Sequence, residues 1–236
     1  MRKFVLIALT LAFITTTFAQ TKTSPKPAGV AKTTAVSEKL VEIKTDYGTM
    51  VVKLYDSTPL HRDNFIKLVQ QKFYDSLLFH RIIQGFMIQG GDPQSKNADS
   101  TAMLGNGEAP GEMIPAEFRQ NIYHKKGALA MARTENPEKA SSNCQFYIVQ
   151  GKPADNDMLN QIECGVRQNG NMGFYFTDAE RKTYNTIGGT PFLDQNYTVF
   201  GEVIKGLDVI DKIAGVQTGA NDRPVKDVRM KMRMLN

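Results

Sequence analysis

The chain of 236 residues contains no tryptophan, only two cysteines and only three histidines. It has no C-x-x-C pair, no H-E-x-x-H helix, no G-x-S-x-G nucleophile elbow and no P-loop. The first two motifs mark metal or redox sites, the third marks serine hydrolases and the fourth binds nucleotide phosphates. The sequence therefore gives no sign of these four kinds of chemistry.

The composition is otherwise that of an ordinary globular protein. Hydrophobic residues make up 41% and charged residues 22%, which argues against a disordered or fibrous chain. The length suits one domain with appendages. The formal net charge of +5 is a mild basic excess and does not by itself indicate nucleic-acid binding.

Residues 1–19 have the pattern of a signal peptide. Arg2 and Lys3 give a positive start, residues 4–14 form an apolar run too short for a comfortable membrane span, and Ala19 is a small residue at the expected cleavage site. We expect an exported protein, with the periplasm as its compartment; secretion and anchoring by an uncleaved signal are the alternatives. Residues 20–38 are rich in Thr, Lys, Ser, Pro and Ala and predict a flexible linker, which leaves 39–236 as the folded domain.

Short alternating segments dominate that domain. Residues 41–45 and 50–54 predict a hairpin, and further strands are expected at 79–83, 86–89, 127–133, 145–149, 197–203 and 228–234. Thr58-Pro59 predicts the start of a helix that runs to about residue 71, and residues 207–214 predict a second helix closed by Gly215. Many short strands with two helices and no βαβ repeat favour an antiparallel barrel.

Two of the histidines lie in unremarkable sequence contexts. His61 falls on the first predicted helix without a second ligand at metal spacing, so we expect a surface or half-buried side chain. The segment 124–126, His-Lys-Lys, predicts a small basic turn that is solvated.

One stretch, residues 79–92, reads Phe-His-Arg-Ile-Ile-Gln-Gly-Phe-Met-Ile-Gln-Gly-Gly-Asp. Strand alternation places Arg81 and Ile83 on one face, with Phe79 if the strand is regular. In the next strand, the same alternation places Phe86 and Ile88 on one face. An arginine among apolar side chains needs a partner or access to water, so its plainest interpretation is an ion pair or a side chain that reaches solvent.

This stretch resembles the signature of the cyclophilin-type peptidyl-prolyl isomerases, F-H-R-I-I-x-G-F-M-x-Q-G-G-D. A second family block, G-x-L-x-M-A followed after a loop by Q-F-F-I, is similar to residues 127–132 and 145–148. A third, W-L-D followed by V-F-G-x-V, is similar to residues 192–194 and 199–203. The blocks occur in the family's order, and the resemblance covers about residues 41–236 apart from one insertion.

The resemblance implies the cyclophilin fold, which is an all-β, closed, eight-stranded antiparallel barrel capped by two α-helices. It also implies a site in which Arg81 is the catalytic arginine and Gln89 holds it. The implied proline pocket is formed by Phe86, Met87, Tyr147 and Leu193, with Tyr197 at its rim. The implied groove for the flanking peptide is formed by Gln145, the backbone of Ala132 and Arg133, and Phe192.

The implied activity is cis–trans isomerisation of Xaa-Pro bonds, in support of the folding of exported proteins. The barrier to this rotation is roughly 18–20 kcal/mol, and an arginine that donates to the prolyl nitrogen favours the twisted state over the planar one. Since no covalent bond is made or broken, we expect no metal and no cofactor. The expected partners are proline-containing polypeptides rather than nucleic acid, and we expect a monomer. The alternative is a binding module or chaperone on the same fold that holds proline segments without turnover.

Four positions depart from residues common in the family. Tyr147 stands where Phe is common, and its hydroxyl at the pocket floor must find a partner or water. Phe192 replaces a tryptophan whose indole N–H is associated with cyclosporin binding, so the resemblance implies weak sensitivity to that drug. Tyr197 replaces a histidine and Arg133 replaces an asparagine, and neither change touches the catalytic donor.

The insertion spans about residues 151–190. Residues 157–164 predict one or two helical turns, and Thr177-Asp178-Ala179-Glu180 predicts a capping box that opens a helix ending at Gly188-Gly189. One interpretation of the insertion is a surface decoration. The other is a lid or a partner contact, because the insertion returns directly into Phe192 beside the pocket. A disulfide between Cys144 and Cys164 would tether it to the site strand, but the spacing alone leaves this open.

Overall fold

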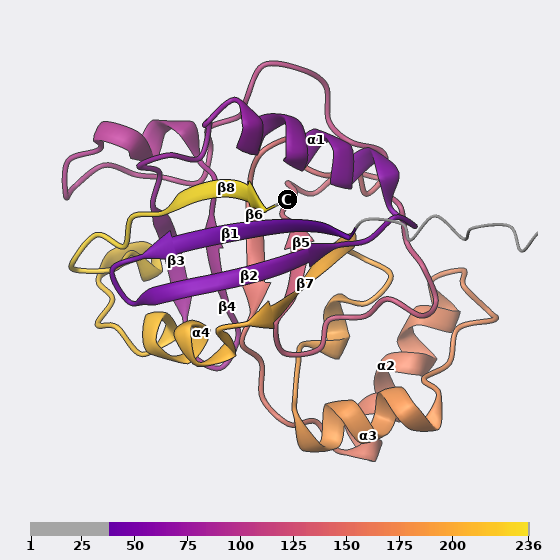
Figure 1. Cartoon of the computed structure of the whole chain (residues 1–236). Helices are drawn as coiled ribbons and strands as arrows, with labels where there is room; N and C mark the ends of the chain where they lie inside the picture. Colours follow the sequence, from indigo (N-terminus) through magenta and orange to yellow (C-terminus); the bar gives the residue numbers. More distant parts are fainter. Residues whose placement is uncertain (1–37, 236) are drawn as a thin grey trace, which may run out of the picture. The chain divides into compact units, whose positions relative to one another are not determined.

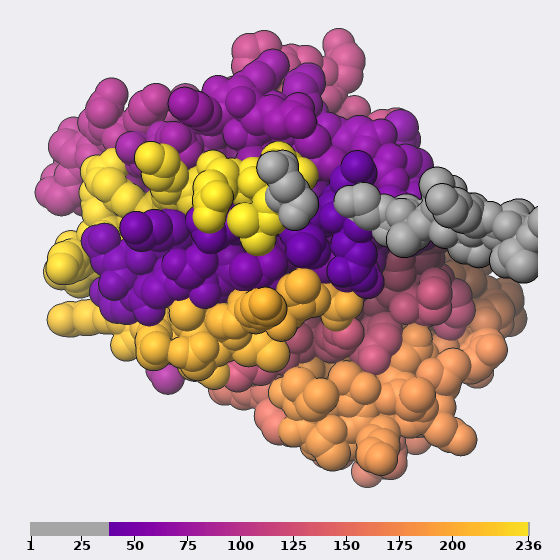
Figure 2. Space-filling view, in the orientation of Figure 1, coloured from indigo at the N-terminus to yellow at the C-terminus, as the bar shows by residue number. Residues whose placement is uncertain are grey.

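The computed structural model describes residues 38–235, so the predicted signal peptide and nearly all of the predicted linker lie outside the described residues. Eight strands form one antiparallel sheet (Figure 1). They are β1 Lys39–Thr45, β2 Gly48–Leu54, β3 Phe79–Ile83, β4 Met87–Gly90, β5 Ala128–Met131, β6 Phe146–Val149, β7 Val199–Lys205 and β8 Lys231–Leu235. Their order is β3-β4-β6-β5-β7-β2-β1-β8, so the first and last strands lie side by side, as the indigo and yellow atoms of Figure 2 show.

The sheet is curled but open, and the predicted closure into a barrel is not confirmed. The edge strands are β3 and β8, and within residues 38–235 no ladder pairs them. The chain before β8 links the edges instead, because the Phe79 amide donates to the Val228 carbonyl and the Met230 amide to the Leu77 carbonyl, both at 2.9 Å. The alternation over 228–234 therefore begins as an irregular bridging segment and becomes a strand only at Lys231.

Strand β3 is not regular. Its register against β4 shifts between Phe79 and Arg81, so Phe79 packs in the main core while Arg81 lies on the opposite face. Phe86 precedes β4 and packs beside Met87 on that opposite face, whereas Ile88 enters the main core. The alternation argument therefore misplaces Phe79 and Phe86, because it assumes a ladder without a bulge or a turn.

Strand β6 has both faces covered. Phe146 and Ile148 lie in the main core, while Tyr147 and Val149 belong to a second apolar cluster on the other face of the sheet. This double burial explains why β6 is a continuous apolar run rather than an alternating one. The second cluster positions the candidate site described below.

The two predicted helices cover the main core. Helix α1 (Pro59–Gln70) and helix α4 (Leu207–Ala214) lie above and below the β1–β2 hairpin in Figure 1. Each contributes an apolar stripe, which consists of Phe65, Leu68 and Val69 in α1 and of Val209, Ile210 and Ile213 in α4. The periodicity of these stripes is that of helices buried on one face.

A distant glutamate caps the start of α1. Thr58 occupies the predicted N-cap position, but its side chain makes no capping hydrogen bond. The carboxylate of Glu117 accepts hydrogen bonds from the amides of Leu60 and His61 at 3.3 and 3.0 Å, where the helix dipole favours a negative charge. His61 itself is fully buried, so the expected surface or half-buried position is wrong.

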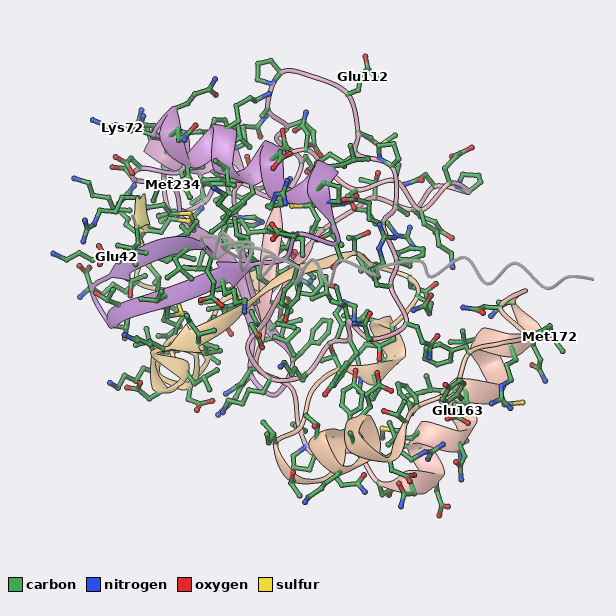
Figure 3. The ribbon with its side chains drawn as sticks, turned by 45° about the vertical axis from the view of Figure 1, so that its right-hand side comes forward. Glu42, Lys72, Glu112, Glu163, Met172 and Met234 are labelled. Carbon is green, nitrogen blue, oxygen red and sulfur yellow. The ribbon has the colours of Figure 1, made fainter. Side chains whose placement is uncertain are left out.

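The insertion is a small helical lobe with its own apolar cluster, which includes Leu159, Phe176 and Tyr184. Helix α2 (Asn156–Gln168) is longer than the one or two turns predicted, and helix α3 (Asp178–Thr186) begins with the predicted capping box. Glu163 on α2, labelled in Figure 3, pairs with Arg181 on α3 at 2.6 Å and so joins the two helices.

Three short 3-10 segments complete the fold, η1 Pro93–Asn97, η2 Pro191–Leu193 and η3 Ala220–Asp222. Across residues 38–235, no helix combines the length and the apolar character that a membrane crossing would require. Cys144 is buried, Cys164 is exposed on α2, and both are free thiols. The disulfide that the sequence left open is therefore not formed in this structure.

Candidate active site

A small cavity lies on the face of the sheet opposite the main core. Its volume is about 130 Å³. Nine of the eleven residues implied by the resemblance line it, namely Arg81, Phe86, Met87, Gln89, Ala132, Arg133, Tyr147, Leu193 and Tyr197. We call this cavity the candidate proline pocket. The other two residues are its neighbours, since Gln145 contacts Gln89 and Phe192 packs against Phe86.

Arg81 borders the pocket and is held from two sides. Its Nη1 donates to Oε1 of Gln89 at 3.4 Å, and its Nε lies 3.4 Å from Oδ2 of Asp222. The register of β3 against β4 places Arg81 directly opposite Gln89, which explains the first contact. The Arg81 side chain is 41% exposed, so the guanidinium keeps donors free to meet a bound molecule.

A chain of side-chain amides orients Gln89. The Nε2 group of Gln145 donates to the carbonyls of Gly105 and Gly107 at 3.0 and 2.8 Å. The Oε1 atom of Gln145 therefore faces Gln89 and accepts from its Nε2 at 3.2 Å. This arrangement turns the oxygen of Gln89 toward Arg81. Gln145 is only 4% exposed, so in this structure its contact with the site is the hydrogen bond that orients Gln89.

The backbone of Ala132 is also engaged within the protein. Its amide donates to the Gln145 carbonyl at 2.8 Å, and its carbonyl accepts from the Ser142 amide at 2.9 Å. The resemblance implies that the backbone of Ala132 and Arg133 binds peptide. The amide of Ala132 is thus already used within the protein, whereas its carbonyl can accept a second hydrogen bond.

The pocket floor is formed by Tyr147, whose hydroxyl lies 2.9 Å from Nε2 of His124. The predicted need for a partner is thus met by a histidine that is 1% exposed. The expectation that segment 124–126 is solvated is wrong for His124. Burial raises the pKa of the Tyr147 phenol well above its ordinary value, so the hydroxyl stays protonated and can donate to the imidazole.

His124 is held in turn by Asp194. The Oδ1 atom of Asp194 lies 2.6 Å from Nδ1 of His124 and accepts the His124 amide at 2.9 Å. The Oδ2 atom accepts the hydroxyl of Tyr184, on α3, at 2.6 Å. A buried network of four side chains therefore runs from Tyr147 at the pocket floor to the insertion.

Aromatic side chains form the rim of the pocket. Phe192 is 53% exposed and packs against Phe86, with ring centroids 5.7 Å apart and the ring planes tilted by 32°. The guanidinium of Arg133 lies 4.7 Å above the Tyr197 ring and donates from Nε to the Asn196 carbonyl at 3.0 Å. A cation–π contact of this kind stabilises this arrangement of the two side chains.

A larger groove of about 980 Å³ adjoins the pocket and shares Arg81, Gln89 and Arg133 with it. Its remaining walls are mainly residues 100–106 and 219–225, and we call it the charged groove. His80 also lines it, and neither of its buried ring nitrogens has a hydrogen-bond partner.

Burial lowers the pKa of His80 to about 4; nearby Asp92 opposes this shift, and the cations Arg81 and Arg223 add to it. The His80 imidazole is therefore neutral near pH 7.

A second histidine cluster has the side chains of a hydrolytic triad, but it is buried where no substrate can reach it. His61 lies 2.7 Å from Oε2 of Glu117 through Nδ1 and 2.9 Å from Oγ of Ser141 through Nε2. This carboxylate–imidazole–hydroxyl order is that of serine hydrolases. Ser141 is 1% exposed and His61 is fully buried, so a substrate cannot reach the hydroxyl, and the cluster instead fixes the start of α1.

Asp222 is the site residue that sequence reasoning missed next to Arg81. It lies in η3, far from the motif blocks, and its backbone adopts the left-handed conformation with φ of 59°. Within residues 38–235, no cluster of three or more His, Cys, Asp or Glu side chains is arranged to hold a metal ion.

Comparison with known proteins decides the family. The family model of the cyclophilin type peptidyl-prolyl cis-trans isomerase/CLD matches residues 40–233. The chain belongs to the cyclophilin-type peptidyl-prolyl cis-trans isomerases. A relative from Staphylococcus haemolyticus, named as a peptidyl-prolyl cis-trans isomerase, is 35% identical over 193 residues, which cover 81% of this chain and 88% of the relative. The chain is therefore an enzyme of this isomerase family.

A second relative is much longer than the part of it that matches this chain. It is named as a bifunctional phosphatase/peptidyl-prolyl cis-trans isomerase of Streptococcus pyogenes and is 37% identical over 191 residues. The match covers 80% of this chain but 37% of that protein.

Solved structures agree on the fold. A cyclophilin type isomerase of Cryptosporidium parvum has a TM-score of 0.60 at 22% identity, covering 84% of this chain and 98% of that one. The structure of the same protein determined in the presence of the dipeptide Ala-Pro has a TM-score of 0.59 at 23% identity, covering 84% and 99%.

Proposed function

We propose that this enzyme isomerises Xaa-Pro bonds by donating a hydrogen bond from Arg81 to the prolyl nitrogen. The observation that carries the proposal is a guanidinium, oriented by Gln89 and Asp222, at the edge of a small pocket with aromatic and aliphatic side chains on its other walls. As the bond twists, C–N resonance is lost and the nitrogen gains a lone pair that Arg81 can meet. The planar ground state offers no such acceptor, so the interaction favours the twisted state selectively.

The pocket supplies the rest of the proposed mechanism. Phe86, Met87, Tyr147 and Leu193 would grip the proline ring while the acyl side rotates, and Gln89 would hold the arginine. Apolar walls exclude water and so strengthen the hydrogen bond from the guanidinium. Uncatalysed rotation takes tens to hundreds of seconds, and bringing it to milliseconds requires about 10⁴- to 10⁵-fold acceleration, or roughly 6 kcal/mol.

The proposed substrates are proline-containing segments of polypeptides. The dipeptide present with the Cryptosporidium parvum protein belongs to this class, and the family assignment supports extending it to this chain. The neutral Tyr147 phenol and the apolar pocket walls suit a ring without charge.

Exchange spectroscopy on a tetrapeptide with one Xaa-Pro bond tests the proposal. We expect rapid cis–trans exchange with the wild type and a fall in kcat/KM of at least about 100-fold in Arg81→Ala. Arg81→Lys, which keeps the charge but loses the planar fork of donors, should recover only part of the activity. Peptide binding without exchange in the wild type would favour the non-catalytic binding module instead.

We further propose that the enzyme is exported and assists the folding of exported proteins. The support is the positive, apolar and small-residue pattern of residues 1–19. Protein recovered from the periplasm should begin at Gln20. Recovery of the intact chain from the cytoplasm would contradict the proposal, and an intact chain in the membrane fraction would identify an uncleaved anchor.

A further inference from the structure

We infer that the insertion supplies a second binding groove, which holds the segment of substrate polypeptide adjoining the proline. The inference rests on the proposed isomerase function and names a substrate contact that the proline pocket does not include. The groove has a volume of about 430 Å³. The C-terminal half of α2 forms one wall, and residues 192–196 form another. We call it the insertion groove.

The insertion groove begins where the proline pocket ends. Phe192 lines the groove and packs against Phe86, which lines the pocket. Asn196 lines the groove and its neighbour Tyr197 lines the pocket. A polypeptide that leaves the pocket past Phe192 therefore passes directly into the insertion groove.

The lining fits an extended, uncharged polypeptide. Ile162 and Val166 of α2 offer apolar surface. The side-chain amides of Asn169, Asn171 and Gln195 also line the groove; the two asparagines each donate one N–H within the protein, to the Gly165 carbonyl and to Oε1 of Gln195, and Gln195 donates to the Arg119 carbonyl. The second N–H and the carbonyl oxygen of each asparagine remain available to a peptide. An amide both donates and accepts, so it can pair with the N–H and C=O groups of a peptide backbone. Apolar surface between such groups accommodates side chains of the same segment.

The single cation of the insertion groove is already engaged. The Nζ atom of Lys139 donates to Oδ1 of Asn196 at 2.8 Å and to the Gln195 carbonyl at 3.1 Å. Burial and the nearby Arg133 lower its pKa. Because this charge serves contacts within the protein, the groove does not favour an anionic ligand such as a phosphate or a nucleic acid.

Substrate length should decide whether the insertion groove is used. The charged groove adjoins the pocket at Arg81, and the insertion groove adjoins it at Phe192. A tetrapeptide spans little more than the pocket, since an extended residue covers about 3.3 Å. A peptide of about twelve residues, spanning roughly 40 Å, reaches beyond the pocket on both sides.

Gly165 allows the insertion groove to be filled without disturbing the fold. It lies in α2 and lines the groove, and a Cβ atom added there meets no heavy atom within 4 Å. A side chain in the interior of the helix also favours the helical state over glycine. Gly165→Leu should therefore fold and place a branched side chain in the groove. Gly165→Ala gives the same gain for the helix and leaves the groove open, so it is the matched control.

The test measures isomerisation by the full chain on two peptides, a tetrapeptide with one Xaa-Pro bond and a peptide of about twelve residues with a central proline and leucines on both sides. We expect Gly165→Leu to raise KM for the long peptide at least about threefold relative to Gly165→Ala. On the tetrapeptide the two variants should agree, because the catalytic centre is unchanged. The long peptide should also shift the amide resonances of Val166 and Asn169 in the wild type.

Two outcomes separate failure of the groove from failure of the enzyme. If Gly165→Leu and Gly165→Ala have the same KM for the long peptide and the α2 amide resonances do not shift, the insertion groove does not bind substrate and the inference is overturned. If the wild type fails to isomerise the tetrapeptide, the proposed function itself is overturned, while the amide shifts still report whether the groove binds polypeptide.

Discussion

The hydroxyl of Tyr147 lies 2.9 Å from Nε2 of His124, so the floor of the candidate proline pocket contacts a buried imidazole. The other ring nitrogen, Nδ1, lies 2.6 Å from Oδ1 of Asp194, so both nitrogens of the imidazole have a partner. The polar atom of Tyr147 is therefore satisfied behind the pocket. The face that Tyr147 presents to the pocket is therefore its aromatic ring.

Tyr147→Phe should reduce stability more than catalysis. The change leaves Nε2 of His124 buried without a partner, which costs about 1–2 kcal/mol. Because the hydroxyl is bonded to His124, KM for a proline tetrapeptide should change by less than about twofold. Urea denaturation and peptide kinetics on the same preparation measure both quantities. A large rise in KM with unchanged stability would show that the hydroxyl serves the substrate instead.

Tyr184→Phe should weaken the same network from its far end. The Tyr184 hydroxyl donates to Oδ2 of the buried Asp194, and loss of a hydrogen bond to a carboxylate costs about 2 kcal/mol. Tyr175→Phe, at an exposed position of the same lobe, should leave the free energy of unfolding unchanged and is the control.

A double-mutant cycle of Tyr147→Phe with Tyr184→Phe tests whether the network acts as one unit. Because Asp194 and His124 connect the two hydroxyls, the cycle should give a coupling of at least about 0.5 kcal/mol. Strictly additive losses would mean that the two ends of the network are energetically independent.

Gln89 should matter more to the orientation of Arg81 than Asp222 does. Gln89 is fixed through Gln145 to two backbone carbonyls, whereas the Arg81–Asp222 pair is about half exposed on both sides and such pairs are weak. We expect Gln89→Ala to lower kcat about tenfold or more, and Asp222→Asn to lower it less than about threefold. Asparagine is a suitable replacement because it tolerates the left-handed backbone of residue 222.

Added salt distinguishes the two contacts further. An exposed ion pair is screened as ionic strength rises, so the small effect of Asp222→Asn should disappear at high salt. The effect of Gln89→Ala should persist, since Gln89 carries no charge and its position is fixed by a hydrogen bond to the neutral amide of Gln145. If both variants lowered kcat equally at all salt concentrations, Gln89 would not matter more than Asp222 and the prediction would be wrong.

The sequence predicted the parts of the site that depend on motifs. The strand β3, the two core helices and the capping box at Thr177 follow from local patterns, and the pocket residues follow from the family blocks. These signals are local in the chain, so periodicity and spacing can reveal them. The family was recognised for the same reason, because its blocks keep their order.

The partners of these residues could not be predicted because they lie far apart in the sequence. Asp222 reaches Arg81 only through the packing of η3 beside β3, and Glu117 reaches the start of α1 from a long loop. His124 has no local signal of burial, since two lysines follow it. Whether the sheet closes into a barrel could not be predicted either, because closure depends on whether the two edge strands pair with each other.

Stability should fall as the pH is lowered from about 6.5 to about 4, and His80 should be a main cause. Its pKa is about 4 in the folded protein and about 6.5 in an unfolded chain. Between about pH 6.5 and about pH 4 the His80 imidazole is protonated in the unfolded state but stays neutral in the folded state. Each step down in pH over this range therefore favours unfolding further. The stability at stake is roughly 3 kcal/mol, fully present above pH 6.5 and lost below pH 4.

His80→Leu isolates this contribution. The two ring nitrogens make no hydrogen bond in the fold, so replacing them with apolar atoms should change stability at pH 7 by less than about 1 kcal/mol. The dependence of the urea midpoint on pH should become clearly shallower in the variant. A residual slope is expected from His61, whose pKa is also lowered by burial against the opposing effect of Glu117. If the wild type and His80→Leu lose stability equally between about pH 7 and about pH 4.5, then His80 does not remain neutral in the fold, and the loss arises from other groups.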